Sequence, residues 1–599
     1  MKIYKNRKEV PDKYKWDLTE FYKSDDEFLE NLKETDKKIQ KLSNYKKFYE
    51  DPRTFKEFLD LYIDVLSEIF NESGYAYLKN DEVLGVAKNI DNVNRVTLLE
   101  TKFNKAVAFF EPELLKLSKD KFDLLINDEL LKDYAFMLQE IYRNKEHTLS
   151  ENEEKIVTEL VNSTNNYSQI SSVLLNSEHN YGKIKLDDNT KEDIATTNFR
   201  RLMKNKNPLI RKKVYNSFNK RLHEYGQTSA SLLSSYVNLN NSLSKIRNFD
   251  SAWDKHLFNI NLTDKVYGSL VNIVEGNLTS LHNYYALKRK VLGFEKLHQY
   301  DLALNMSSND KEYTIEDCQT ILLKAVKPLG KDYVDRFEKI FKNNYVDYCQ
   351  YKGKCSGGYS LATLDKNTRI LMSFNGDLDS ISTLAHEGGH NVHHQYIMEN
   401  NSLQYRQEPR IVSEVASLTN EFLLSDYIYN NLSSKSEKLA GLENIIGVIV
   451  SNLYGAVREG KIEKEFYEYA LLGNAITREY LDDITVKSLK KYYGNNVVMD
   501  KYSKNTWITR MHYYMDFYLY NYAVCVSVAA YVSSQILKGN KDMLDKYIQF
   551  LSTGSNVPPM DAYKILGVDI EKEDIYIETI NYFNELVTKY EKLYFDKEV

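Results

Sequence analysis

The sequence predicts a mainly α-helical protein that folds as several lobes. The chain has 599 residues, of which 42% are hydrophobic, so it can bury more core than one small domain. Only eight prolines interrupt it, and none lies between Pro208 and Pro328 or between Pro409 and Pro558. Because proline ends or kinks a helix, such gaps permit long helices. Apolar residues recur every three or four positions along most of the chain, as one buried helix face requires.

The helical pattern is clearest in two runs. Within 210–246 the apolar residues Ile210, Val214, Phe218 and Leu222 recur among Arg, Lys and Asn, and 266–291 follows the same pattern. We expect further helices from comparable patterns in 27–70, 114–140, 150–180, 436–468, 506–538 and 572–594.

One region departs from the helical pattern. Between about 345 and 376, glycines surround the run 369–374, whose sequence RILMSF is typical of a short strand bounded by turns. We therefore expect a small sheet here. Asp377 or Asp379 can then cap the start of a helix through 381–398, because a carboxylate satisfies free backbone N–H groups.

Composition argues against several classes of partner. The net charge is −6 and no basic block occurs, so neither nucleic acid nor a membrane surface is expected to bind. No run approaches the roughly 18 to 20 consecutive apolar residues of a membrane span, and the first residues lack the apolar core of a signal peptide. We expect a cytoplasmic protein. The four cysteines lack zinc-knuckle or CxxC spacing, so we expect buried or incidental thiols at Cys318, Cys349, Cys355 and Cys525.

The predicted helix after the strand contains His386-Glu387-Gly388-Gly389-His390, an HExxH motif. Histidines four residues apart lie about 40° apart around a helix, so both rings can reach one metal ion. Glu387 lies about 100° around from His386, where it can contact an activated water without binding the metal. The alternative is a chance match containing an ordinary core histidine, but four of the eleven histidines fall within 386–394, which favours a site.

A catalytic zinc keeps three protein ligands, so HExxH needs one more. The predicted helix in 410–425 offers Glu414 and Glu421, which are seven residues apart and share a face. One could bind the metal while the other holds a ligand by hydrogen bonding, and spacing leaves the choice open. Either could also be a solvated helix carboxylate.

The HEGGH motif followed by the segment EVASLTNE, residues 414–421, resembles oligoendopeptidase F, a branch of the thimet oligopeptidase family of zinc metallopeptidases. The segments in 10–28, 284–302, 353–360 and 547–570 also resemble that family, in order. The resemblance implies a helical, multi-lobed zincin-type metallopeptidase with a small sheet beside the active-site helix and an internal substrate channel. It implies one Zn²⁺ per chain bound by His386, His390 and Glu414, with Glu421 behind the ligands.

The predicted organisation follows the same resemblance: an N-terminal helical region (1–110), a helical lobe covering the channel (111–200) and a catalytic zinc-peptidase domain (201–599). One departure concerns Gly388, where the family usually carries a large apolar residue. A glycine inside a helix costs roughly 1 kcal/mol, so the rigidity of this helix is in question.

The resemblance also assigns roles to residues of a tyrosine-rich segment, 507–526, and the glycine-rich sequence GKCSGGYS, 353–360, is a further candidate for contact with a peptide. An aromatic core stripe and a surface hairpin are the alternatives. His512, Tyr520 and Tyr522 are the candidates for donors to the oxyanion, ranked above Tyr518, which we assign to substrate binding. Small residues in 353–360 would let a bound peptide approach the backbone, while the edge of the strand 369–374 would pair with that peptide. The remaining candidates for substrate binding are Gly357, Gly358, Tyr359, Ile370 and Leu371.

These observations predict a zinc-dependent oligoendopeptidase that cleaves short peptides, with Glu387 as general base. A dipeptidyl carboxypeptidase of the same wider family is one alternative. A peptide-binding homologue that has lost turnover is the other, since Gly388 departs from the family pattern. The oligomeric state is left open.

Overall fold

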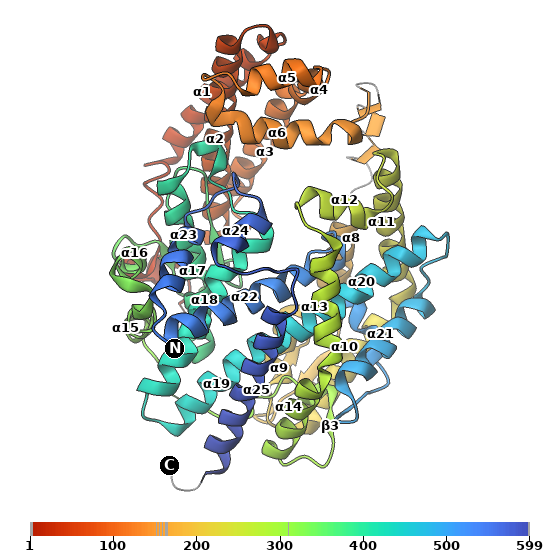
Figure 1. Cartoon of the computed structure of the whole chain (residues 1–599). Coiled ribbons are helices and arrows are strands. Elements are labelled where there is room, and N and C mark those ends of the chain that lie inside the picture. Colours follow the sequence, from red (N-terminus) through yellow and green to blue (C-terminus); the bar gives the residue numbers. More distant parts are fainter. Residues whose placement is uncertain are drawn as a thin grey trace. The chain divides into compact units, whose positions relative to one another are not determined.

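The structure is a computed structural model, and it describes residues 4–596 apart from 151–152, 155, 158–159, 162–165 and 310. It is mostly helical with small sheets, as predicted (Figure 1). The chain divides into two compact units, each built from three separate segments. Unit 1 comprises Met1–Glu151, Asp310–Ile428 and Val532–Val568, and unit 2 comprises Asn152–Asn309, Tyr429–Tyr531 and Asp569–Val599. The predicted division at residues 110 and 200 stays a prediction.

Unit 1 contains most of its helices in two groups. The first group is N-terminal and packs around an aromatic core that includes Phe48, Phe55 and Phe58. Its helices are α1 (Asp25–Leu42), α2 (Pro52–Glu82), α3 (Ala87–Val107), α4 (Phe110–Leu115), α5 (Lys119–Ile126) and α6 (Ala135–Arg143). The second group comprises α15 (Ile315–Ala325), α16 (Gly330–Lys342), α17 (Leu378–Asn400), α18 (Arg410–Asn431), α23 (Lys541–Leu551) and α24 (Pro559–Ile565).

The predicted small sheet lies in unit 1 and contacts α17. Its strands are β4 (Val346–Asp347), β5 (Tyr359–Leu361) and β6 (Arg369–Leu371), in the order β4-β6-β5. β6 pairs in parallel with β4 and antiparallel with β5. The expectation that a peptide pairs with the edge of the 369–374 strand is therefore wrong, because β6 is the central strand and both its edges are occupied. Ile370 and Leu371 are fully buried and are no longer candidates for substrate binding.

Unit 2 is also helical. Its helices are α8 (Tyr167–Val173), α9 (Thr196–Met203), α10 (Pro208–Glu224), α11 (Gly226–Ile246), α12 (Ala252–Asn259), α13 (Asp264–Gly276), α14 (Leu278–Val291), α19 (Lys435–Ile449), α20 (Ala456–Leu471), α21 (Arg478–Tyr493) and α25 (Asp574–Phe595). Two small pairs of strands accompany them: β1 (Lys183–Lys185) with β2 (Lys191–Asp193), and β3 (Leu297–His298) with β7 (Val497–Val498). Helix α22 (Leu519–Leu537) crosses the boundary between the units, as the end of α18 does.

The predicted helical runs correspond to real helices but break more often. The run 27–70 is two helices, because Asp51 caps a new helix that opens with Pro52. The prediction of a helix over 506–538 is wrong in its first part, because two short 3₁₀ segments, Ser503–Thr509 and Met511–Tyr514, precede α22. Part of the run 150–180 lies outside the described residues.

One feature of unit 2 bears on the membrane expectation. α19 and α20 are joined by a π-helical segment, Val450–Gly455, so that Lys435–Leu471 is one continuous helix. Its most apolar 18-residue window has a mean hydropathy of 1.3, and the helix is long and apolar enough to cross a membrane. Half of that window is buried inside the structure. Core helices of globular proteins have the same length and composition, so this helix alone does not assign a membrane location.

Gly388 lies where α16 packs against α17. A Cβ placed on Gly388 would lie 2.3 Å from Cζ of Phe337, a fully buried ring on α16. Real side chains do not approach so closely, so the ring occupies the space that a side chain at 388 would need. Phe337 thus fills the volume that a side chain at 388 would take, and α17 is held from this side although it carries two adjacent glycines.

The first prediction tests whether the Phe337 ring fills the space beside Gly388. Replacing glycine by alanine inside an open helix should stabilise it by up to about 1 kcal/mol. Gly388→Ala should instead lower the free energy of unfolding by about 1 to 3 kcal/mol, because the methyl group overlaps the Phe337 ring. Adding Phe337→Ala makes room, so the double variant should lose less than the sum of the two single losses in urea unfolding.

Gly447 on α19 supplies the control. Apart from its chain neighbours and the backbone of its own helix, no atom lies within 4 Å of a Cβ built there, so Gly447→Ala should keep or raise stability. Equal behaviour of the two alanine variants would mean that Phe337 does not fill the space at 388.

Candidate metal centre

Two helices of unit 1 bring the candidate ligands together (Figure 1). α17 begins where the Asp377 side chain accepts a hydrogen bond from the Ser380 N–H, at 2.8 Å, so Asp377 is the predicted cap. α17 then meets α18 at Gly389. A Cβ there would lie 2.6 Å from Cα of Ser417 and 2.7 Å from the carbonyl oxygen of Ala416. Only glycine allows this approach of the two backbones.

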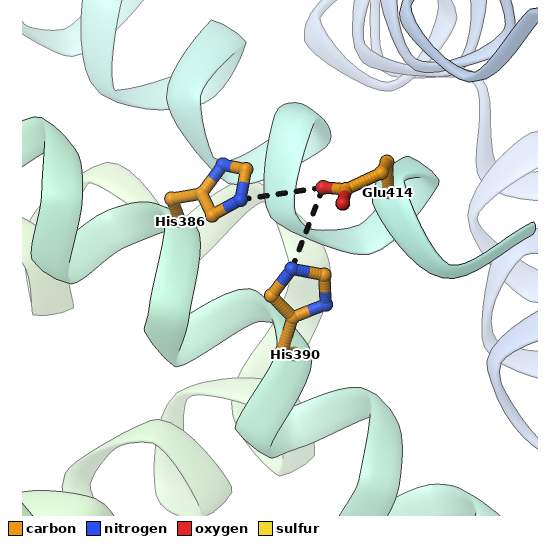
Figure 2. Close-up of side chains that lie close together, drawn as sticks. All are labelled: His386, His390 and Glu414. Atoms are coloured by element: carbon orange, nitrogen blue, oxygen red, sulfur yellow. Dashed lines mark ion pairs between the residues drawn. The ribbon is translucent and has the colours of Figure 1, made fainter. Parts of the chain in front are cut away.

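His386, His390 and Glu414 converge across this contact (Figure 2). Nε2 of His386 lies 3.3 Å from Oε2 of Glu414, and Nε2 of His390 lies 3.4 Å from the same oxygen. Two imidazole nitrogens and one carboxylate oxygen within 4.8 Å of one another form the donor set of a catalytic zinc, which keeps a further position open. The residues present therefore fit a zinc ion.

The other nitrogen of His386 is held from behind. Its Nδ1 lies 2.8 Å from Oε1 of Glu421, and the Ser382 hydroxyl donates to Oε2 of Glu421 at 2.8 Å. A carboxylate on Nδ1 orients the ring so that Nε2 points at the metal position. Glu414 and Glu421 thus approach opposite nitrogens of His386, a distinction that spacing in the sequence does not make.

The charges of these groups depend on one another. Burial acts to raise the pKa of Glu414, but hydrogen bonds and charge from His386 and His390 outweigh it and hold that pKa well below its usual range. Burial acts to lower the pKa of both imidazoles, but the carboxylates beside them reverse this and raise both pKa values. Burial also raises the pKa of Glu387, so its carboxyl is a stronger base than an exposed glutamate.

Gly358, the residue before strand β5, lies beside Glu387. A Cβ on Gly358 would lie 2.9 Å from Cγ2 of Thr383 and 3.8 Å from Oε1 of Glu387. Gly358 is exposed, and Gly357 before it has a positive φ of 99°, which favours glycine. Gly358 therefore lies next to the motif, while the Tyr359 hydroxyl donates to Asp81 at 2.7 Å.

Sequence reasoning missed a hydrogen-bonded link behind the ligands. The Tyr333 hydroxyl donates to Oδ1 of Asn420 at 2.9 Å, and Nδ2 of Asn420 donates to the carbonyl oxygen of Ala385 at 3.1 Å. Both side chains are fully buried. The link joins α16, α18 and α17 one residue before His386. A polar residue within the buried stretch of α18 was the only signal in the sequence.

The histidine cluster noted in the sequence separates in the structure. Nδ1 of His393 lies 2.7 Å from Oε2 of Glu408, near the start of α18. Burial lowers the pKa of His394 to about 4, so this ring is neutral. Neither lies within the described group of side chains that could hold a metal, which comprises His386, His390 and Glu414.

The predicted oxyanion donors lie in unit 2, and three of the rings gather. The ring centres of His512 and Tyr518 are 6.2 Å apart, those of His512 and Tyr522 also 6.2 Å, and those of Tyr518 and Tyr522 5.2 Å. Tyr520 lies elsewhere: it is 1% exposed, and its hydroxyl is 3.0 Å from Nε2 of His256. The catalytic role predicted for Tyr520 therefore loses its support.

Comparisons with known proteins agree with this geometry. The pattern of peptidase family M3 matches residues 201–582, and that of oligopeptidase F matches residues 113–181. Oligopeptidase PepF of Bacillus subtilis is 30% identical over 591 residues, covering 98% of this chain and 88% of that protein.

Two solved structures have the same fold. A chain from Chlamydophila abortus, described as a candidate peptidase, superimposes with a TM-score of 0.88 at 25% identity and covers 98% of this chain and 100% of its own. Oligoendopeptidase-F from Enterococcus faecium superimposes with a TM-score of 0.74 at 24% identity, covering 95% of this chain and 99% of its own. With a family match over most of the chain and the HExxH helix in place, this protein belongs to peptidase family M3.

Proposed function

We propose that the protein is a zinc-dependent oligoendopeptidase that hydrolyses internal bonds of short peptides. One observation carries this proposal: Nε2 of His386 and Nε2 of His390 converge on one oxygen of Glu414, with the buried Glu387 between them in the sequence. Glu387 is absent from the ligand group, so its carboxylate is available as a base.

His386, His390 and Glu414 would hold one Zn²⁺, which when bound supplies a Lewis acid that acidifies water and polarises the peptide carbonyl. Glu387 accepts the proton of the attacking water and passes it to the leaving amine. The raised pKa of Glu387 suits both steps. Its carboxylate binds the proton of water more readily than an exposed glutamate does, and the carboxyl group so formed can donate that proton to the amine. Glu421 keeps His386 in the orientation that leaves Nε2 unprotonated for binding.

We propose that the substrate pairs with β5 rather than with β6. The N–H groups of Ile370 and Met372 point away from β5, toward the chain at Tyr345 and Asp347. The backbone N–H and C=O groups of Arg369 and Leu371 therefore face β5, where these residues pair with Leu361 and Tyr359. The backbone of Ser360 then points to the outer edge, which no described strand occupies. An extended peptide could add to this edge beside Glu387.

For the developing oxyanion we propose donors from His512, Tyr518 and Tyr522, supported by the family resemblance and by the gathering of these rings.

The substrate channel that the resemblance implies stays a prediction. The cytoplasmic location and the absence of nucleic-acid and membrane partners stay proposals based on composition. The argument for a homologue without turnover weakens, since Phe337 accounts for Gly388.

The second prediction concerns the general base. Glu387→Gln keeps the shape of the side chain but cannot accept a proton at this position. We expect about one equivalent of zinc to remain bound by metal analysis, while turnover of an internally quenched peptide falls by at least about 10²-fold. Substantial remaining turnover would show that Glu387 is structural.

The third prediction separates the two carboxylates of α18. Glu414→Ala should weaken zinc affinity and turnover severely, because a ligand is lost. Glu421→Ala removes only the partner of Nδ1, so a milder loss of about 10- to 100-fold is expected. Competition with a chelator measures both affinities, and the opposite order would exchange the two roles.

The fourth prediction tests the outer edge of β5. Ser360→Pro removes one outward N–H without removing a bond to β6, so KM should rise about two- to tenfold, the value of one hydrogen bond. Ser360→Ala is the matched control, because it keeps the backbone donor and the Oγ atom has no partner in the described structure. If both variants keep the parental KM, peptides do not pair with this edge.

A further inference from the structure

The segment between His512 and α22 has an unusual backbone. Asp516 and Phe517 both have positive φ values, 48° and 62°, and neither is glycine. Aspartate tolerates this left-handed region, whereas a bulky residue such as phenylalanine rarely adopts it. Two successive residues of this kind persist only where their surroundings impose the conformation, and such strain is concentrated at functional sites.

A buried carboxyl group imposes the conformation at Phe517. The Phe517 N–H donates to Oε1 of Glu463, on α20, at 2.9 Å. Glu463 is fully buried, and burial raises its pKa well above the usual range, with the nearby carboxylates of Asp516 and Glu459 adding to this. The Phe517 ring packs at the same place, 5.0 Å from Trp253 and 4.5 Å from Tyr467 between ring centres.

The side chain of Asp516 is held by a different helix. Its Oδ1 accepts hydrogen bonds from the Tyr236 hydroxyl and from Nδ2 of Asn240, each at 2.6 Å. Both donors lie on α11. The strained turn is therefore fixed by α11 through a side chain and by α20 through the backbone.

The residues on either side of His512 are held as well. The Tyr513 hydroxyl donates to Oε2 of Glu459 at 2.6 Å, and Nη2 of Arg510 lies 3.3 Å from Oε1 of the same carboxylate. Glu459 is also buried and lies one turn before Glu463 on α20. Two carboxyl groups on one face of α20 thus hold this segment: Glu459 contacts the residues around His512, and Glu463 contacts the turn that follows.

We infer that Glu463 and Asp516 are positioning residues, which hold the strained turn and thereby set the ring cluster of His512, Tyr518 and Tyr522 for transition-state binding. Neither residue needs to touch substrate. This inference rests on the proposed function, in which the three rings donate to the oxyanion. The turn lies between His512 and Tyr518, whose ring centres are 6.2 Å apart, so its backbone conformation sets where the two rings lie relative to each other.

The experiment compares Glu463→Ala and Asp516→Ala with the conservative variants Glu463→Gln and Asp516→Asn. Measured are kcat, KM, zinc content, thermal unfolding and the inhibition constant of a phosphinic peptide, a tetrahedral analogue of the transition state. The alanine variants should lose at least tenfold in kcat and in analogue affinity, while KM and zinc content change less than twofold. The conservative variants should recover most of both, since an amide oxygen still accepts these hydrogen bonds.

Glu443→Ala is the matched control, because Glu443 on α19 also accepts backbone N–H groups, from Met306 and Ser307, in the same unit. It should lower thermal stability without changing kcat. The inference is wrong and the two residues are merely structural in either of two cases. In the first, Glu463→Ala and Asp516→Ala behave like Glu443→Ala; in the second, their zinc content falls and their KM rises together with the loss of kcat.

His512→Ala distinguishes this failure from failure of the proposed function. A loss of kcat and analogue affinity in His512→Ala, with none in the alanine variants of Glu463 and Asp516, overturns only the inference. If His512→Ala leaves both unchanged, the oxyanion role of the cluster fails and the inference fails with it.

Discussion

The candidate metal centre depends on the contact between α17 and α18 at Gly389. With a side chain there the two backbones would have to separate, because a Cβ would overlap Ser417 and Ala416. Glu414 lies one turn before Ser417, and the Ser417 hydroxyl donates to Oε2 of Glu414 at 3.0 Å. Glu421 lies one turn after Ser417 and reaches the other nitrogen of His386. The point where α18 comes closest to α17 therefore lies between Glu414 and Glu421 along α18. The distances from both carboxylates to His386 depend on this contact.

Such a contact needs support, because two glycines in succession weaken α17. The support comes from residues with no direct chemical role. Phe337 fills the space at Gly388, and the Tyr333–Asn420 link ties the backbone at Ala385 to α16 and α18. In a close-packed interior, these contacts limit small shifts that would separate the ligands. The same helices thus provide both the ligands and the rigidity of the site.

Local patterns in the sequence predicted what depends on local geometry. HExxH places His386 and His390 on one helical face, and that needs only the period of a helix. The choice between Glu414 and Glu421 could not be made from spacing, because both lie on one face and the register of α18 against α17 decides it. The order β4-β6-β5 is set by pairing between distant segments, so the edge was assigned to the wrong strand. The 3₁₀ segments before α22 were mispredicted for a similar reason, because the strained turn there is a tertiary effect. The burial of Tyr520 against His256 is another tertiary effect that spacing does not show.

The balance of charge gives a further reason why this arrangement suits a divalent cation. Glu387, Glu414 and Glu421 place three carboxylates around two imidazoles, and Glu387 and Glu421 are buried. Buried carboxylates are costly unless they are paired with positive charge or bind a metal. If both rings are protonated, each can pair with Glu414, but neither Nε2 then has a lone pair to offer. With a dication instead, both imidazoles can stay neutral and the carboxylates are still compensated, while Glu387 keeps its capacity to accept a proton. One doubly charged ion therefore compensates the carboxylates as well as two protons do, and it does so while both imidazoles stay neutral.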